Sequence, residues 1–257
     1  MRLGGYMFAE ERKNKIIELI KSGQSVKVSE LAKMFNVSES TIRRDLNELK
    51  VIGVIVRTHG GAVSSLNTNF EPSFIEKQDK YLYEKDYIGK IAARFINDGD
   101  TIILDSGTTT QCIARYITAK NVTIITNSVN LANDLSSRED IEVIITGGII
   151  RPKTKAMVGF IAENTLKQFR VDKAFIGANG VSIKYGVTTP NSMEANVKRA
   201  MMENAKEVYL CVDSSKFNEV TFSLICPVSR VNYIITNNME DEEKVKYKKL
   251  GVEVITE

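Results

Sequence analysis

Short apolar runs that alternate with amphipathic stretches constrain the fold of this chain more than any other feature. From residue 101 onward, β-prone runs are separated by helical segments. The runs are TIIL (101–104), VTIIT (122–126), IEVIIT (141–146), DKAFIG (172–177), EVYLCV (207–212), VNYIIT (231–236) and VEVIT (252–256). Such alternation is typical of parallel strands joined by crossover helices. The sequence therefore predicts an α/β domain with an open, mostly parallel, doubly wound sheet and helices on both faces.

Loops rich in Ser, Thr, Gly and Asn follow several of these predicted strands. In an open parallel sheet such loops lie at the carboxyl ends of the strands, where ligands bind. The loop DSGTTT at 105–110 comes before a helix, so its backbone N–H groups and hydroxyls suit an anion such as phosphate. The GxxxxGK[ST] pattern of nucleoside triphosphate sites is absent. Each loop taken alone is better explained by turn chemistry, but together they favour a pocket for a polyhydroxylated anion.

The candidate residues of this effector pocket share small, hydroxyl, amide or charged side chains near predicted strand ends. They are Asp105, Ser106, Gly107, Thr108, Thr109, Thr110, Asn127, Ser128, Gly147, Gly148, Asn179, Glu194, Lys198 and Lys216. Glu194 and Lys198 are four residues apart on a predicted helix, so both can face one pocket.

The first quarter of the chain has a different pattern. Apolar residues recur at helical spacing in 8–21, 26–35 and 38–51, and Asn36-Val37 makes a short break before the N-cap residue Ser38. Two β-prone pieces then flank His59-Gly60-Gly61, as in a hairpin. These elements predict a winged helix-turn-helix over residues 1–63, a polar linker over 64–73 and an effector domain over 74–257.

The third predicted helix has the division of faces that a DNA recognition helix needs. Ile42, Leu46 and Leu49 share the inward face, whereas Arg44 and its polar neighbours lie on the opposite face. Arginine can pair bidentately with guanine, and hydroxyl or amide groups can bond phosphates or base edges. The candidate DNA contacts are Ser38, Ser40, Thr41, Arg43, Arg44, Asn47, Arg57 and His59. The alternative is an amphipathic helix whose arginines are merely solvated.

Charge distribution agrees with DNA binding by this region. Residues 1–60 contain 11 Lys and Arg against 7 Asp and Glu, whereas the remainder contains 24 against 25. The net charge of +3 therefore arises from the first quarter of the chain.

The stretch SESTIRRDLNELKVIGVIVRTHGGAV at 38–63 resembles the signature of the DeoR family of bacterial sugar-metabolism regulators. The resemblance implies that Arg43, Arg44 and Arg57 contact double-stranded operator DNA, and that Asp45 and Leu46 are structural. It also implies that the effector domain is similar in fold to ribose-5-phosphate isomerase. In that domain Ser106–Thr110 would hold the phosphate of a phosphorylated sugar.

The same resemblance implies that Asn179, Glu194, Lys198 and Lys216 line the sugar end of the pocket. The stretch around residues 178–202 resembles family members that sense fructose 1-phosphate, and glycerol 3-phosphate and other sugar phosphates stay open as alternatives. Related enzymes carry an acidic loop where this chain has Asn179, whose amide cannot act as a carboxylate base. They also place a lysine before the glycines where this chain has Thr146.

The competing hypothesis is a sugar-phosphate isomerase or deaminase with an appended DNA-binding domain. Acid–base chemistry on a sugar needs a titratable group at the reacting carbon. The chain has one histidine, His59, and it lies in the predicted wing. We therefore expect a regulator and not an enzyme, with no cofactor and no metal, in which Asp105, Glu194 and Asp213 orient the ligand.

Compartment and assembly follow from simpler features. The three cysteines are widely spaced, and no apolar run is long enough to cross a bilayer, so a cytoplasmic protein is expected. One small helix-turn-helix offers few phosphate contacts, so we expect a homodimer or homotetramer that reads two half-sites.

Overall fold

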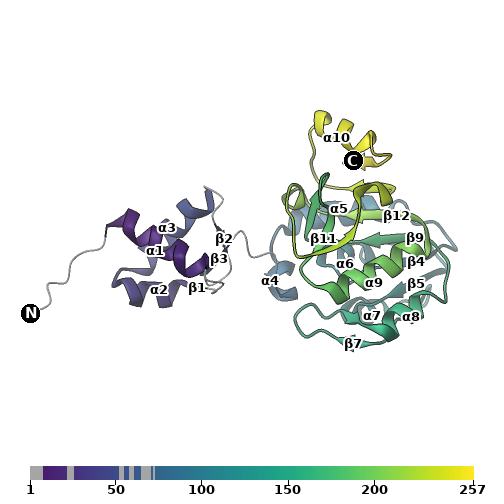
Figure 1. The fold of residues 1–257 in the computed structure, drawn as a ribbon. Helices are drawn as coiled ribbons and strands as arrows, with labels where there is room; N and C mark the ends of the chain where they lie inside the picture. Colours follow the sequence, from purple (N-terminus) through teal and green to yellow (C-terminus); the bar gives the residue numbers. More distant parts are fainter. Residues whose placement is uncertain (1–7, 22–25, 52–54, 58–60, 65–70, 72) are drawn as a thin grey trace, which may run out of the picture. The chain divides into compact units, whose positions relative to one another are not determined.

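The computed structural model of the chain describes residues 8–21, 26–51, 55–57, 61–64, 71 and 73–257. It divides into two compact units, residues 1–70 and residues 71–257 (Figure 1). The division falls within 64–73, the stretch that the sequence predicts as a linker. Within that stretch, Glu71 and Ser73 form contacts inside the second unit, which are described below.

The first unit contains, among its described residues, three helices and a small antiparallel sheet. The elements are α1 (Ala9–Lys21), β1 (Val26–Lys27), α2 (Val28–Phe35), α3 (Glu39–Val51), β2 (Ile55–Arg57) and β3 (Gly61–Ser64). At Asn36 a φ of 52° ends α2, a left-handed conformation that asparagine tolerates. Strand β3 pairs with both β2 and β1, so residues 26–27, predicted to begin a helix, form a strand instead. These elements form the predicted winged helix-turn-helix.

Helix α3 packs inward through the face that the sequence predicts. Ile42, Leu46 and Leu49 are buried in a core shared with α1 and α2. Ser38 accepts a hydrogen bond from the backbone N–H of Thr41 (3.2 Å), which confirms Ser38 as the residue that caps α3.

A buried ion pair also fixes α3 to α1. Arg12 Nε and Nη2 donate to the two carboxylate oxygens of Asp45 at 2.5 and 3.1 Å. Arg12 is 6% and Asp45 3% exposed. The Asp45 hydrogen bond raises the pKa of Arg12, against the lowering effect of burial. Asp45 therefore has the structural role that the family resemblance implies.

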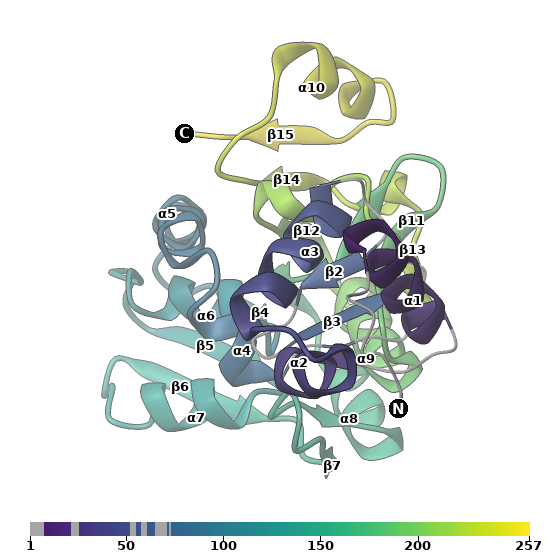
Figure 2. The same ribbon diagram turned by 90° about the vertical axis from the view of Figure 1, so that its left-hand side faces the viewer.

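The second unit is built on a seven-stranded sheet whose neighbouring strands are all parallel. The strands are β4 (Thr101–Leu104), β5 (Val122–Thr126), β6 (Ile141–Ile145), β9 (Val171–Ile176), β12 (Ala205–Cys211), β14 (Tyr233–Ile235) and β15 (Glu253–Ile255). Their order is β15-β14-β12-β9-β4-β5-β6. Figure 2 shows β15, β14, β12, β4, β5 and β6 in this order from top to bottom. All seven predicted runs form strands of this sheet.

Helices cover both faces of the sheet because successive strand residues point to opposite sides. Ile102 and Leu104 of β4 face a core formed with helices α5, α6 and α7, and Ile103 faces a second core formed with α8, α9 and α10. The helices of the unit are α4 (Phe74–Gln78), α5 (Leu82–Ala93), α6 (Thr108–Ala114), α7 (Val129–Leu135), α8 (Phe160–Leu166), α9 (Ser192–Glu203) and α10 (Asp241–Lys248). This is the doubly wound arrangement that the alternating sequence predicts (Figure 2).

Two smaller sheets and two short 3-10 helices were not predicted. They are the hairpin of β7 (Ile149–Ile150) and β8 (Met157–Val158), the antiparallel sheet of β10 (Gly180–Ser182), β11 (Gly186–Thr189) and β13 (Ser223–Cys226), and the 3-10 helices Ser214–Lys216 and Val228–Arg230. Their strands are two to four residues long, too short for a clear periodicity.

The direction of the chain through the large sheet reverses next to β4. From β4 the chain proceeds outward to β5 and β6, and it then returns to place β9 on the other side of β4. The connections after β4 and β9 lead to opposite faces of the sheet, so a crevice forms at their carboxyl ends. This reversal, between β4 and β9, is the switch point of the fold.

Candidate functional site

Helix α3 presents several polar side chains to solvent. Ser40, Arg43, Arg44 and Asn47 are exposed and Thr41 is half-buried, while the apolar face of the same helix is buried. Arg43 donates a hydrogen bond to Glu39, one turn earlier, at 2.7 Å. For Arg44 the described part of the chain provides no hydrogen bond or ion pair. The structure thus brings the candidates on α3 onto one accessible surface.

The predicted wing is only partly described. Arg57 lies in β2, with its backbone opposite Ala62 of β3, as expected for a wing strand. His59 lies outside the described residues. Ser38, also a predicted DNA contact, is exposed at the start of α3, where its hydroxyl caps the helix.

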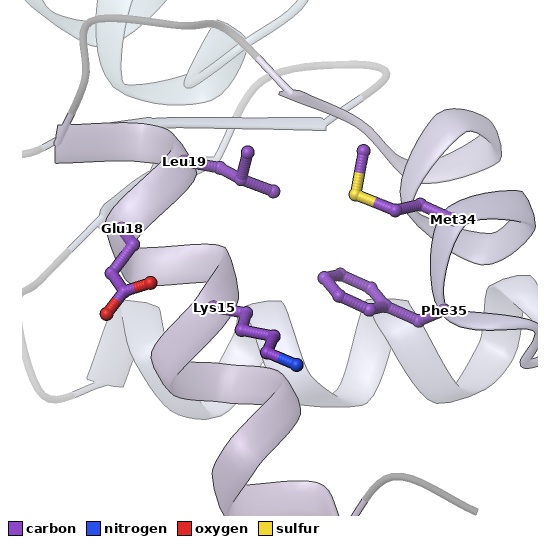
Figure 3. Close-up of a pocket in the computed structure, with 5 residues that line it drawn as sticks. All are labelled: Lys15, Glu18, Leu19, Met34 and Phe35. Atoms are coloured by element: carbon purple, nitrogen blue, oxygen red, sulfur yellow. The ribbon is translucent and has the colours of Figure 1, made fainter. Parts of the chain in front are cut away.

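A groove of about 370 Å³ lies between α1 and α2 in the first unit. Leu19 of α1 faces Met34 and Phe35 of α2 across it, and Lys15 and Glu18 complete its lining (Figure 3). Its walls are mainly carbon, without the hydroxyl and backbone donors that a phosphate needs. We assign no ligand to this groove.

A second cavity, of about 120 Å³, opens at the switch point of the large sheet, and we call it the switch-point cavity. Eight of the predicted effector residues line it, from the segments that directly follow β4, β9 and β12 and from α9. They are Ser106, Gly107, Thr108, Thr109, Asn179, Glu194, Lys198 and Lys216. Segments that are up to 110 residues apart in the sequence thus converge where the strand order reverses.

Asp105 and Thr110 lie beside this cavity and support it. Asp105 is fully buried, and its Oδ2 accepts hydrogen bonds from Lys198 Nζ and from the Gly177 backbone N–H, the latter at 3.0 Å. The hydroxyl of Thr110 donates to the Asp105 carbonyl oxygen at 2.6 Å, which shapes the loop. Asp105 Oδ1 is buried without a hydrogen-bond partner among the described residues.

A network of charged side chains forms another wall. Arg151 holds Glu71 bidentately, with Nη1–Oε1 and Nη2–Oε2 distances of 3.0 and 2.6 Å, and it also donates to Glu194. Thr154 donates to the same Glu194 oxygen at 2.6 Å. These carboxylates raise the pKa of Arg151 further above its ordinary value, the Glu71 hydrogen bond most strongly. A residue of the cavity wall, Glu194, therefore shares its partner with Glu71, which begins the second unit.

Sequence reasoning missed one side of the cavity. The missed lining residues are Glu76, Lys77, Lys80, Tyr81, Lys85 and Thr154. Gly177, Ala178 and Asp213, which also line the cavity, belong to the predicted strand-end loops but are not among the candidate residues given above. Helices α4 and α5 are separated at Tyr81, whose φ of 57° is unusual for a bulky residue. No local pattern indicated that their side chains would approach the loop after β4.

Four predicted effector residues do not line the cavity, because they follow β5 and β6, which lie beyond β4 from the switch point. Asn127 Nδ2 donates to the Met157 carbonyl (3.2 Å), and Ser128 caps α7. At Gly148, where φ is 110°, a Cβ would lie 2.6 Å from the Val158 carbonyl oxygen. Gly147 also has a positive φ, of 68°. These residues have the turn and capping roles that were the alternative explanation.

Metal and membrane features are easily summarised. Across the described ranges, His, Cys, Asp and Glu side chains form no group of three that could hold a metal ion. Nor does any helix in the part of the chain that is described combine the length and apolar character needed to cross a membrane.

Comparison with known proteins gives the family. The profile described as "DeoR-like helix-turn-helix domain" matches residues 12–68, and that described as "DeoR C terminal sensor domain" matches residues 81–238. The HTH-type transcriptional regulator IolR of Bacillus subtilis is 39% identical over 90% of this chain and 92% of its own length. The lactose phosphotransferase system repressor of Staphylococcus epidermidis is 37% identical over 96% and 98%.

A solved structure of D-ribose-5-phosphate isomerase is similar at 19% identity, with a TM-score of 0.39, over 52% of this chain and 53% of that one. The fold description depends on the strand order given above and not on this likeness. The relatives are named as transcriptional regulators and repressors. These names agree with the expectation of a regulator and not an enzyme. The family matches confirm the resemblance seen at residues 38–63: the chain belongs to the DeoR family and is a DNA-binding transcriptional regulator, not an enzyme.

Proposed function

We propose that this regulator represses a sugar uptake or catabolic operon and that a phosphorylated sugar in the switch-point cavity controls its affinity for operator DNA. The observation that carries the proposal is the lining of that cavity. Hydroxyls of Ser106, Thr108 and Thr109, the amide of Asn179 and the amine of Lys198 meet there. Hydroxyl and amide groups suit the hydroxyls of a sugar, and cationic and N–H donors suit phosphate.

The loop of residues 106–109 is the proposed phosphate site. It is lined by small and hydroxyl-bearing residues, so an anion can approach its backbone N–H groups. Nearby, the unpartnered Oδ1 of Asp105 is a buried carboxylate oxygen that lacks a donor. Because such a group costs free energy, a ligand hydroxyl or a water molecule is expected to bind there.

Ligand binding can change operator affinity only if the ligand binds two arrangements of the protein unequally. The proposed route runs through Glu194, Arg151 and Glu71. A ligand that engages Glu194 competes with Arg151, whose guanidinium also holds Glu71. Glu71 is the first residue of the second unit, so a change in its ion pair with Arg151 is expected to affect the segment that leads back to the DNA-binding unit.

A panel of phosphorylated sugars tests the proposal, with the full-length protein and fructose 1-phosphate as the first candidate. The effector is expected to raise the melting temperature and to weaken operator binding in a gel-shift assay. Thr109→Val removes one cavity hydroxyl at nearly constant volume and is expected to weaken effector binding about fivefold to tenfold. Operator binding without effector should stay unchanged.

Thr118→Val is the matched control, because Thr118 is exposed and does not line the cavity. It should leave both the melting shift and the gel shift as in the wild type. Equal effector affinity of the Thr109→Val and wild-type proteins would contradict the placement of the ligand. Absence of any melting shift across the panel would contradict the proposed function itself.

We also propose that the protein assembles with a second copy of itself through an apolar patch near the β6 edge of the sheet. The patch consists of Ile145, Ile149, Ile150, Phe160 and Ile161, which are all at least half exposed. Ile161 lies next to Gly147 and Ile149 next to Gly159, so the side chains form one surface. Contiguous exposed apolar surface marks interaction sites, and a helix-turn-helix needs a second copy to read two half-sites.

Phe160→Glu is expected to reduce the mass of the protein in solution. Phe160 is 77% exposed at the start of α8, where an acidic residue favours the helix, so the fold should persist. Light scattering after size exclusion should show a smaller species than for the wild type. Val245→Glu changes an exposed position of α10 and should leave the mass unchanged. A wild-type monomer, or an unchanged mass for Phe160→Glu, would contradict this assembly.

A further inference from the structure

The side of the switch-point cavity that sequence reasoning missed contains three lysines, which we call the lysine arc. Lys77 belongs to α4, Lys80 to the turn after it and Lys85 to α5, and all three line the cavity. They face a space whose other wall is the proposed phosphate loop, residues 106–109. The arc therefore adds three ammonium groups to a site that already has hydroxyl and N–H donors for a phosphate.

The other charged groups of the cavity have partners within the protein. Lys198 pairs with Asp105, Lys216 lies 3.7 Å from Asp213, and Glu194 is bonded to Arg151. Glu76 accepts hydrogen bonds from Ser73 in a capping box. The charges of Lys198, Lys216 and Glu194 are thus largely neutralised before any ligand binds, whereas Glu76 keeps its negative charge because its partner Ser73 is neutral.

The lysine arc differs in this respect. Within the described ranges, none of its three ammonium groups has a carboxylate oxygen within 4.0 Å. Lys85, 4% exposed, donates to the carbonyl oxygen of Lys77, and Lys80 Nζ lies 5.1 Å from the centre of the Tyr81 ring. These contacts provide partial charges only, and the carboxylates that act on the arc from beyond ion-pair distance, Glu194 and Glu71 on Lys77 and Asp213 on Lys85, compensate its positive charge only in part.

Burial makes this arrangement costly for the protein alone. Loss of hydration lowers the pKa of Lys77, and it lowers the pKa of Lys85 to about 8, with the nearby Asp213 opposing the shift and Lys216 adding to it. A buried ammonium group is stabilised when a counter-charge comes within a few ångströms. A ligand that supplies this counter-charge gains more from the arc than a neutral group does.

We propose that the effector carries two anionic groups: a phosphate at residues 106–109 and a second phosphate or carboxylate at Lys77, Lys80 and Lys85. This inference rests on the proposed function, because it concerns the same cavity, and it narrows the ligand class to sugar bisphosphates and phosphorylated sugar acids. A sugar monophosphate fills the first position and leaves the lysine arc without its counter-charge.

Pairs of ligands that differ in the second anion test the proposal by calorimetry on the full-length protein. Fructose 1-phosphate is compared with fructose 1,6-bisphosphate, and glucose 6-phosphate with 6-phosphogluconate. At least one ligand with two anionic groups should bind about tenfold to a hundredfold more tightly than its partner with one, the effect of a charge-assisted contact. The pair that shows the gain distinguishes a second phosphate from a carboxylate.

Variants then locate the second anion. Lys77→Met and Lys80→Met keep most of the side-chain length. They should remove most of the extra affinity for the ligand with two anionic groups, while the Kd of the monophosphate changes less than threefold. Lys80 is exposed, so its replacement is compatible with folding, and a melting curve checks Lys77→Met. Lys90→Met, at an exposed position of α5, is the matched control and should keep the full advantage.

Two outcomes overturn the inference without overturning the proposed function. In the first, both members of each pair bind equally well, which means that one phosphate suffices. In the second, the two lysine variants weaken the binding of monophosphates and of ligands with two anionic groups by the same factor, which means that the arc holds the only phosphate. If no phosphorylated compound binds at all, the proposed function fails, and that result is distinguishable from both.

Discussion

Replacing Arg44 with alanine is expected to reduce operator affinity by about thirtyfold or more while leaving the fold intact. A good bidentate contact between arginine and guanine is worth about 1–3 kcal/mol, and the proposed dimer would present the residue twice, so the expected loss is about 2–6 kcal/mol. Arg44 is exposed on α3, opposite its buried face, and makes no hydrogen bond or ion pair with the described residues that the fold would lose. Fluorescence anisotropy at a fixed salt concentration measures the effect. The DNA is the duplex that the wild-type protein selects from a random pool.

The control for this prediction must remove the same charge elsewhere. Arg115 is an exposed arginine at the end of α6 in the second unit, and Arg115→Ala lowers the net charge equally. Its operator affinity should remain within about threefold of wild type, since an exposed charge outside the recognition helix makes no base contact and is screened at physiological salt. The assignment of α3 as the recognition helix is wrong if Arg44→Ala binds the selected duplex as tightly as Arg115→Ala does.

Replacing Asp45 with asparagine is expected to unfold most of the first unit at room temperature. The change leaves the buried Arg12 guanidinium without its counter-charge, and breaking a buried pair on one side costs about 3–5 kcal/mol. Small domains have total stabilities of about this size. Denaturant unfolding followed by circular dichroism should lose the transition of the first unit, while effector binding to the second unit persists.

A double variant separates the charge effect from packing. Arg12→Met together with Asp45→Leu replaces both partners by apolar groups, and buried ion pairs replaced in this way are often neutral in stability. The double variant should therefore recover most of the stability that Asp45→Asn loses. If the double variant is as unstable as the single one, hydrogen bonding or shape at this position, and not the unpaired charge, holds α3 against α1.

The sequence predicts the strands of the large sheet but not their order. Apolar β-branched runs such as VTIIT mark β5 directly, because both faces of the sheet are covered and every residue benefits from being apolar. The position of β9 next to β4 depends on contacts between residues about 70 apart in the sequence, for example Ile103 with Ala174. No local pattern encodes this pairing.

That limit explains which candidate residues meet at the site. Ser106 and Asn179 follow adjacent strands, β4 and β9, and both line the cavity. Asn127 and Gly148 also follow strands, but β5 and β6 lie on the far side of β4. Lys85 was missed for another reason: its helix reaches the cavity through packing of α5 on α6, which only the tertiary structure determines. Residue chemistry identified the type of site, and strand order selected its members.

The reversal of strand order beside β4 has a consequence for synthesis of the chain. Because β9 inserts next to β4 only after β5 and β6 have been made, a ribosome-bound chain that stops before residue 171 has one half of the cavity and an unpaired β4 edge. Lys216 joins later still. A nascent regulator therefore emerges with its helix-turn-helix complete well before the cavity proposed to bind the effector has formed.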